Sequence, residues 1–197
     1  MGTDKFALRL GAETFAERAL SALRKIADGR VSFVVGANQA EETDRLLPLD
    51  IPKITDVYPN KAAIGGIYTA LAHSENEWTA ILACDYPFVT EDLFTRLAGI
   101  ADSAQANISA VVPIQADGRA QPLCAIYRTK HCRQAAKQLL ESNDIPPARR
   151  LPENVAARWV RFEELADLPG AEYFFTNINT REEYTEAQNI FRRMQDK

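Results

Sequence analysis

Short apolar runs closed by polar turns recur along this chain, and the segment at 78–89 is the most informative of them. It starts with a continuous apolar run, β-branched in part, and leads into Cys84-Asp85-Tyr86-Pro87. Such a run predicts a strand buried on both faces, as in a parallel α/β sheet. Asp85 would then lie just past the carboxyl end of the strand, where open α/β sheets bind ligands.

Helical and extended patterns alternate through the first half of the chain. Apolar positions at helical spacing follow Thr14-x-x-Glu17, which offers a capping box. The expected elements, in order, are a helix at 15–27, a strand at 31–35, a helix ending at 47, a strand at 51–54, a helix at about 64–73, a strand at 78–83 and a helix at about 91–101. This order is typical of a doubly wound parallel sheet, although no strand precedes the first helix.

The second half of the chain departs from that order. Strands at 108–114 and 122–127 flank the turn Ala116-Asp117-Gly118-Arg119 and can form a hairpin, which would make the C-terminal part of the sheet mixed. A helix at 131–141, a strand at 157–162 and a last helix capped by Thr180-x-x-Glu183 follow. We find no internal repeat or linker. We therefore expect one domain at 1–197, with a three-layer α/β/α, Rossmann-like fold and a mostly parallel sheet.

Composition excludes several classes of function. The net charge of -4 provides no general basic field for nucleic acid. No window approaches the length of a transmembrane helix and the N-terminus has no signal-peptide core, so we expect a cytoplasmic protein without membrane contact. Cys84, Cys124 and Cys132 lack metal-ligand spacing, and His73 and His131 are the only histidines. The sequence therefore offers few suitable residues for a zinc site or a Ser-His-Asp catalytic centre.

Charged side chains follow the ends of the predicted strands. Asp56 follows the strand at 51–54, Asp85 follows the strand at 78–83, and Lys5 lies where a first strand would have ended. In a parallel sheet these ends converge on one edge. Carboxylate oxygens there can hold Mg²⁺ against phosphate oxygens, and a lysine can offset charge on a leaving pyrophosphate. Each residue alone also fits a structural role: Lys5 as a solvated side chain, Asp56 as a turn residue, and Asp85 as a helix cap.

Two further groups of residues are candidates for ligand contacts. Gly65 and Gly66 precede a helix, where glycine lets the backbone approach a ligand and the helix N-terminus favours anions; a tight turn explains them as well. Asn177 and Asn179 flank Ile178 in an extended segment and either bind a ligand or fix the turn into the last helix. The sequence contains neither G-x-G-x-x-G nor G-x-x-x-x-G-K-[ST]. It therefore lacks the main motifs that would assign it to the dinucleotide-binding oxidoreductases or the P-loop proteins.

These motifs together resemble the molybdenum cofactor guanylyltransferases, a family of Rossmann-like nucleotidyltransferases, over nearly the whole chain. The segments that carry the resemblance are Met1-Gly2-x-Asp4-Lys5, similar to the second half of G-G-x-S-x-R-M-G-x-D-K; Asp56 with Gly65-Gly66-Ile67, similar to Asp and then P-L-A-G-[IM]; Cys84-Asp85-Tyr86-Pro87-Phe88, similar to C-D-x-P-[FY]; residues 121–128, similar to Q-P-L-x-A-[LI]-Y-R; and residues 175–180, similar to F-x-N-[IV]-N-T. The last two narrow the match, because the Asp and Lys residues alone would also fit sugar or isoprenoid-precursor nucleotidyltransferases.

The resemblance implies a fold of the nucleotide-diphospho-sugar transferase type and the transfer of GMP from GTP to molybdopterin, with release of pyrophosphate. It implies that Lys5 and Asp85 are catalytic, that Asp85 binds the cofactor Mg²⁺, and that Asn177 and Asn179 lie towards the second substrate. The nucleotide-binding residues would be Gly2, Lys5, Asn38, Asp56, Gly65, Gly66 and Asp85. GTP and molybdopterin would be the small-molecule partners, and proteins of molybdoenzyme maturation would contact the enzyme.

Two departures from the family pattern keep alternatives open. The first half of the opening signature is absent, and with it the first strand and the Gly-rich phosphate cradle. Because that strand is central in this fold, we expect two neighbouring strands to be left unpaired. In addition, Ala62-Ala63-Ile64-Gly65-Gly66 replaces G-P-L-A-G. A start site further upstream, a CTP- or sugar-phosphate-dependent nucleotidyltransferase of the same fold, and a truncated nucleotide-binding paralogue without catalysis all fit this pattern.

Overall fold

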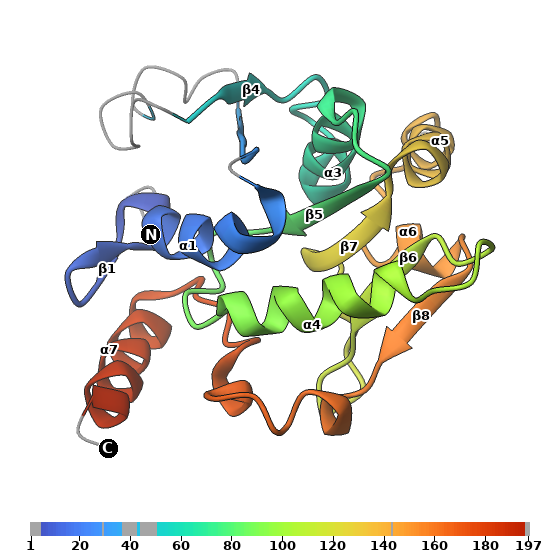
Figure 1. Cartoon of the computed structure of the whole chain (residues 1–197). Helices are drawn as coiled ribbons and strands as arrows, with labels where there is room; N and C mark the ends of the chain where they lie inside the picture. The colour runs from blue at the N-terminus through green and yellow to red at the C-terminus, as the bar shows by residue number, and fades with distance from the viewer. Residues whose placement is uncertain (1–4, 29, 37–42, 44–50, 143, 196–197) are drawn as a thin grey trace.

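The computed structural model describes residues 5–28, 30–36, 43, 51–142 and 144–195. Strands and helices alternate along them (Figure 1). In chain order the elements are η1 Lys5–Ala7, β1 Arg9–Leu10, β2 Glu13–Thr14, α1 Phe15–Ala27, β3 Phe33–Val35, β4 Lys53–Thr55, α3 Ala62–His73, β5 Trp78–Leu82, α4 Glu91–Asp102, β6 Ala110–Pro113, β7 Cys124–Arg128, α5 Thr129–Leu140, α6 Arg150–Glu153, β8 Ala157–Val160, η3 Phe162–Glu164, η4 Ala171–Tyr173 and α7 Arg181–Gln195. The expected helix ending at 47 lies outside the described residues.

A mixed sheet of four strands, in the order β5-β7-β6-β8, forms the centre of the molecule. Strand β7 runs antiparallel to both of its neighbours, while β6 and β8 are parallel, so β5, β6 and β8 all point the same way. The α/β class and the antiparallel β6–β7 pair were predicted and are confirmed. The sheet is mixed, because its β5–β7 and β6–β7 pairs are antiparallel and its β6–β8 pair is parallel. What was not predicted is that β7 inserts between β5 and β6.

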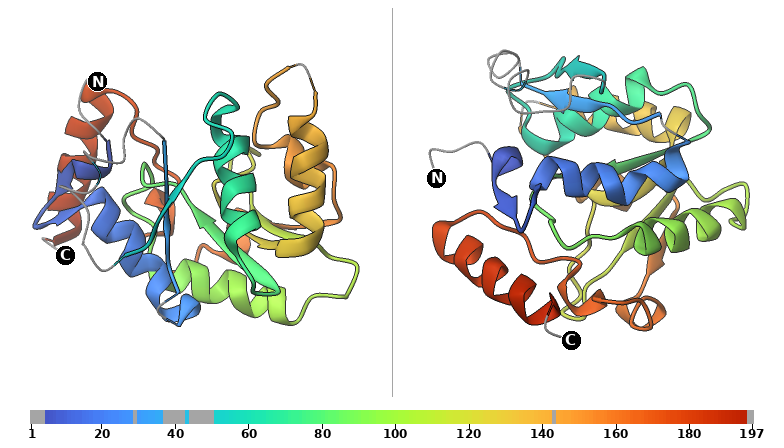
Figure 2. Two further views of the ribbon diagram at one scale, coloured as in Figure 1. Left: turned by 90° about the horizontal axis from the view of Figure 1, so that it is seen from above. Right: turned by 60° about the vertical axis from the view of Figure 1, so that its left-hand side comes forward.

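Helices cover both faces of this sheet and make the three layers that the sequence predicted (Figure 1). Successive residues of a strand point to opposite faces. Accordingly, Cys124 and Ile126 of β7 pack with α4 on one face, whereas Ala125 and Tyr127 pack with α3 and α5 on the other. The side chains of β7 thus contribute alternately to the two hydrophobic clusters on the two faces of the sheet. A third, smaller cluster joins α7 to the N-terminal segment, and the two lie side by side (Figure 2).

Strands β3 and β4 form a separate parallel pair and are not hydrogen-bonded to the main sheet. Among the described residues, β3 is paired with β4 alone and β5 with β7 alone. The expectation that two strands would each lack a partner on one side is therefore confirmed for the described residues. In Figure 1 the β3–β4 pair lies at the top, above β5.

Both predicted capping boxes are present at helix starts. The Thr14 hydroxyl accepts a hydrogen bond from the backbone of Glu17, whose carboxylate accepts one from the Thr14 backbone. Thr180 and Glu183 make the same reciprocal pair before α7. These bonds satisfy amide groups that a helix start otherwise leaves without partners. None of the helices in the described part of the chain is long and apolar enough to cross a membrane.

Candidate functional site

Asp85 lies in the loop that follows β5, as predicted. Its Oδ1 atom is buried and has no hydrogen-bond partner among the described residues. Burial raises the pKa of Asp85 above its usual value, against the opposing effects of the Lys5 charge and the Asn177 side chain. A buried carboxylate oxygen without a partner is costly, because its lost hydration is not replaced. The site therefore suits a bound cation better than an empty state.

Lys5 and the segment around Ile178 surround this carboxylate. The Lys5 ammonium donates a hydrogen bond to Asn179 Oδ1, and Asn179 Nδ2 donates to Asn177 Oδ1 at 2.7 Å. The backbone N–H of Ile178 donates to the backbone oxygen of Asp85 at 3.1 Å, while the Ile178 side chain is fully buried. The buried isoleucine thus anchors the segment, and both asparagines lie on the side of Lys5 and Asp85. The structure brings together Lys5, Asp85, Asn177 and Asn179, four residues that the sequence analysis selected.

Asp56 has a different set of partners. Its Oδ1 atom accepts hydrogen bonds from the backbone of Tyr58 at 2.9 Å and from the Thr69 hydroxyl at 2.8 Å. The first of these is a turn stabilised by an aspartate side chain, the structural role that the sequence left open. Thr69 was missed by the sequence analysis, and the one signal for it was a hydroxyl on the apolar face of a predicted helix. Its side chain is fully buried and ties the end of β4 to α3.

Gly65 and Gly66 lie inside the first turns of α3, because this helix begins at Ala62 and not after the glycines. The expectation that they precede the helix is corrected by packing: Ile64, Ile67 and Leu71 extend one buried face back through the glycines. Lys61 at the N-cap makes no side-chain capping bond. The first-turn amide groups are therefore not occupied by a side-chain cap, as a site for an anion requires.

Gly65 and Gly66 make a matched pair for mutation. A Cβ atom on Gly65 would lie 2.5 Å from the backbone oxygen of Tyr58, whereas one on Gly66 would meet nothing within 4 Å. We expect Gly65→Ala to lower the free energy of unfolding by about 1–3 kcal/mol through overpacking. Gly66→Ala should raise it by about 0.5–1 kcal/mol, because alanine is the better helix former. Urea unfolding of both variants checks this, and equal effects would contradict the assigned packing.

Neither of the two residues that flank Asp85 in the chain is a ready covalent nucleophile. Burial, with a smaller effect of the Asp85 charge, raises the pKa of the Cys84 thiol to about 12. Burial and the same charge raise the pKa of Tyr86 to about 12. Both groups are therefore protonated at neutral pH and unreactive. The Tyr86 hydroxyl donates instead to Gln121 Oε1 at 2.9 Å, which joins the loop after β5 to the loop before β7.

Asp85 offers a single carboxylate group to a metal ion. Within the described ranges, no group of three or more His, Cys, Asp or Glu side chains is placed to hold a metal. Mg²⁺ commonly keeps several waters and binds through one or two carboxylates together with substrate phosphates. The single partnerless oxygen of Asp85 fits that mode.

Gly2 and Asn38, also expected to bind the nucleotide, lie outside the described residues.

Known proteins resemble this chain in sequence. The family model described as "MobA-like NTP transferase domain" matches residues 1–158. A "probable molybdenum cofactor guanylyltransferase" of Bacillus thuringiensis is 30% identical over 178 residues, which cover 89% of this chain and 82% of that protein. One of the same name from Clostridium perfringens is 27% identical over 184 residues, covering 92% and 85%.

Solved structures show the same fold. Molybdopterin-guanine dinucleotide biosynthesis protein A from Archaeoglobus fulgidus superposes with a TM-score of 0.79 at 22% identity, covering 98% of this chain and 92% of that one. The 2-C-methyl-D-erythritol 4-phosphate cytidylyltransferase of Thermus thermophilus superposes with a TM-score of 0.62 at 16% identity, covering 95% and 94%. At these identities the likeness concerns the fold alone, which is of the nucleotide-diphospho-sugar transferase type.

Proposed function

Because this chain belongs to the family of MobA-like NTP transferase domains, we propose that it transfers GMP from GTP to molybdopterin and releases pyrophosphate. The observation that carries the proposal is the buried, partnerless oxygen of Asp85 beside the Lys5 ammonium, at the end of a strand in a nucleotidyltransferase fold. The names of the relatives support the choice of GTP and molybdopterin as substrates. Under this proposal the enzyme acts in the cytoplasm and contacts proteins of molybdoenzyme maturation.

Asp85 is the residue that would hold Mg²⁺. A bound Mg²⁺ would neutralise the charge that develops on the phosphate oxygens. The carboxylate supplies a negative oxygen that no donor among the described residues satisfies, so this oxygen is available to a cation. Binding a cation would also favour the ionised carboxylate, which burial alone disfavours. Asp85 is therefore placed for metal binding more than for proton transfer.

Lys5 would contact the triphosphate and offset the charge on the leaving pyrophosphate. In the reaction, a terminal phosphate oxygen of molybdopterin bonds to the α-phosphorus of GTP, and the bond from that phosphorus to the bridging oxygen breaks. No covalent intermediate is required, because positioning and charge neutralisation supply most of the rate of such reactions. The Asn179 side chain accepts a hydrogen bond from the Lys5 ammonium and donates one to the Asn177 side chain. The two amides therefore position the ammonium group of Lys5. Their second role, towards the pterin, belongs to the same proposal.

The proposal is tested by pyrophosphate release in the presence of molybdopterin and Mg²⁺, with GTP, CTP or UTP as the nucleotide. We expect release with GTP and at least tenfold less with CTP or UTP. A preference for CTP would assign the chain to another nucleotidyltransferase activity of the same fold. Binding of GTP without release under any condition would identify a paralogue that binds nucleotides without catalysis.

A further inference from the structure

The loop that follows β5 carries Asp85 and is tied to a distant part of the chain by a buried pair of side chains. The Tyr86 hydroxyl donates a hydrogen bond to Gln121 Oε1 at 2.9 Å. Tyr86 is 6% exposed and Gln121 is 7% exposed, so water has little access to either partner of this bond. A hydrogen bond in such surroundings fixes the direction of both groups, because leaving one of them unsatisfied is costly.

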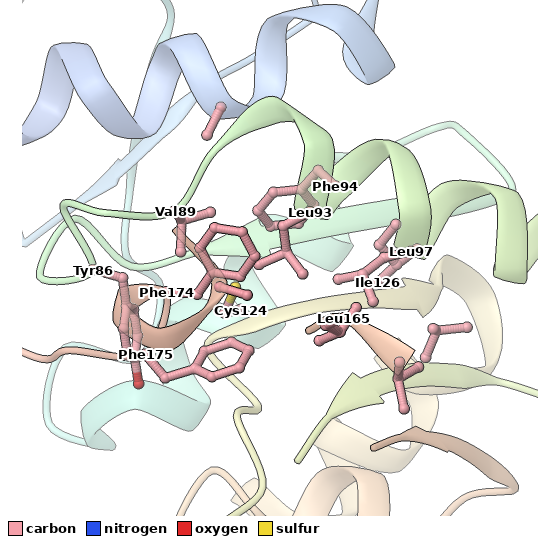
Figure 3. Close-up of a cluster of buried hydrophobic side chains, with 14 of the residues drawn as sticks. Tyr86, Val89, Leu93, Phe94, Leu97, Cys124, Ile126, Leu165, Phe174 and Phe175 are labelled. Carbon is pink, nitrogen blue, oxygen red and sulfur yellow. The ribbon is translucent and has the colours of Figure 1, made fainter. Parts of the chain in front are cut away.

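The ring of Tyr86 is held in place as well. It belongs to the cluster of buried side chains that contains Phe174 and Phe175 (Figure 3). The backbone oxygen of Phe175 accepts a hydrogen bond from Gln115 Nε2 at 3.1 Å, which ties the segment before Asn177 to the loop after β6. The position of Tyr86 is therefore defined at both ends, by the apolar contacts of its ring and by the hydrogen bond of its hydroxyl.

Asn177 lies against both Tyr86 and Asp85. The backbone N–H of the next residue, Ile178, donates to the backbone oxygen of Asp85 at 3.1 Å, and Phe175 packs in the cluster of Tyr86. Burial raises the pKa of Asp85 and of Tyr86, and in each case the Asn177 side chain opposes the rise. An amide has this effect when its N–H groups face the ionised form of the group. The Asn177 nitrogen therefore faces both neighbours.

The Asn177 amide has one orientation that suits all of its neighbours. Its Oδ1 atom accepts a hydrogen bond from Asn179 Nδ2 at 2.7 Å, so Nδ2 of Asn177 remains for the other side. There the Tyr86 hydroxyl uses its hydrogen for Gln121 and presents its lone pairs, and the ionised Asp85 carboxylate is also an acceptor. A reversed amide would place its oxygen against these two acceptors.

The orientation of this amide is coupled to the ammonium group of Lys5. Asn179 accepts a hydrogen bond from Lys5 and donates one to Asn177, so the three side chains form one chain of hydrogen bonds. A reversed Asn177 would turn its nitrogen towards the nitrogen of Asn179, and two donors cannot bond to each other. Asn179 would have to reverse too, and Lys5 would then lose its acceptor. The direction of the Tyr86 hydroxyl thus bears on the position of Lys5.

We propose that Tyr86 and Gln121 form a positioning pair for the site of Asp85 and Lys5. Gln121 sets the direction of the Tyr86 hydroxyl, and the hydroxyl holds the Asn177 amide with its nitrogen towards Asp85. Neither member of the pair contacts a substrate or the metal ion in this role. The inference rests on the proposed function, because it concerns the groups that would hold Mg²⁺ and the triphosphate. Residues that surround metal ligands commonly act in this indirect way.

Tyr86→Phe tests the pair, because it removes the hydroxyl and keeps the ring. The loop retains its backbone hydrogen bonds from Ile178 and Arg18, so the protein should fold. In a Mg²⁺ titration with GTP present, the Mg²⁺ concentration that gives half of the rise in Tm should increase about 10–100-fold, the usual effect of losing a group that orients a metal ligand. The rate of pyrophosphate release should fall by a similar factor.

Tyr127→Phe is the matched control. Tyr127 is fully buried, and its hydroxyl donates to the backbone oxygen of Pro122 at 2.7 Å. Its ring packs on the opposite face of the sheet, in the cluster formed with α3 and α5. Both variants should have a lower Tm, since each loses one buried hydrogen bond. Only Tyr86→Phe should change the response to Mg²⁺, and an equal change in Tyr127→Phe would overturn the proposal.

The double variant Tyr86→Phe with Gln121→Leu separates positioning from stability. It leaves neither polar group of the pair buried without a partner, so it should regain part of the Tm that Tyr86→Phe loses. The weakened response to Mg²⁺ should remain, because the Asn177 amide still lacks the hydroxyl. Recovery of the Tm and of the Mg²⁺ response together would show a merely structural bond and overturn the proposal. If Tyr86→Phe alone does not fold, the double variant carries the comparison with the wild type.

The outcomes separate the positioning pair from the proposed function. If the wild type releases pyrophosphate and Tyr86→Phe matches it in rate and in Mg²⁺ response, only the positioning pair is wrong. If the wild type releases none, the proposed function is wrong, and the Tm titration with Mg²⁺ and GTP still decides the pair. A wild-type Tm that does not respond to Mg²⁺ in the presence of GTP would overturn the pair as well.

Discussion

Replacing Asp85 by asparagine is expected to reduce pyrophosphate release by about 10²–10³-fold, the usual cost of losing one preorganised electrostatic contact in a transition state. Asparagine keeps the size of the side chain but loses the negative oxygen that would hold Mg²⁺. The backbone bond from Ile178 to Asp85 does not involve the side chain and should persist. Circular dichroism should therefore show an unchanged fold.

The same substitution should change stability in a pH-dependent way. Burial raises the pKa of Asp85 above its ordinary value of 3.8, so the folded protein favours the protonated carboxyl. The stability that this preference gives is fully present below the unfolded pKa and is lost as pH rises through the raised folded pKa. At neutral pH the ionised carboxylate destabilises the metal-free protein. Asp85→Asn should therefore have a higher Tm than the wild type at pH 7, and the difference should vanish near pH 3.

Mg²⁺ distinguishes the metal site from a merely structural carboxylate. In the presence of GTP, Mg²⁺ should raise the Tm of the wild type and leave that of Asp85→Asn unchanged, because only the wild type binds the ion. Glu163→Gln, at an exposed position in η3, serves as the control for loss of one carboxylate. Full activity of Asp85→Asn, or an equal Mg²⁺ effect on both proteins, would exclude Asp85 as the ligand.

Replacing Phe94 by alanine should lower the free energy of unfolding by about 3–5 kcal/mol, the range for a buried phenylalanine. Phe94 is fully buried in α4 and belongs to the cluster that also contains Leu93, Leu97 and Phe174 (Figure 3). Truncation would leave a cavity that α4 cannot close, since this helix packs against both α1 and the sheet. Protein domains are stable by only about 5–15 kcal/mol, so the variant should be close to unfolding at 37 °C.

Chemical unfolding in urea measures this effect, with Ile145→Ala as the matched control. Ile145 is 56% exposed, so its truncation should change stability by less than about 0.5 kcal/mol. A loss near 1 kcal/mol in Phe94→Ala would mean that the cluster collapses around the gap. That result would contradict the rigid packing seen between α4 and the sheet.

The order of elements was predictable because each depends on local signals. The capping boxes at Thr14 and Thr180 form as expected, since a side chain and an amide three residues apart meet in any helix start. The strand at 78–82 and the position of Asp85 at its end also follow from one apolar run. Element ends differ from prediction by a few residues; α3 begins at Ala62, so the expectation that Gly65 and Gly66 precede a helix was wrong.

What local patterns could not provide is the pairing between distant segments. Insertion of β7 beside β5, the contact of Lys5 with Asn179, and the separate partners of Asp56 all join residues far apart in the chain. Such contacts depend on how the helices and strands pack, which no spacing along the chain encodes.

The amino-acid pattern was thus enough for the α/β class, the family resemblance and the set of candidate residues, because periodicity and short motifs are local properties. Only the tertiary structure decided that the Asp85 oxygen has no partner among the described residues, and that β7 lies between β5 and β6. Both are properties of space between elements, where burial and hydrogen bonding depend on segments that approach from elsewhere in the chain.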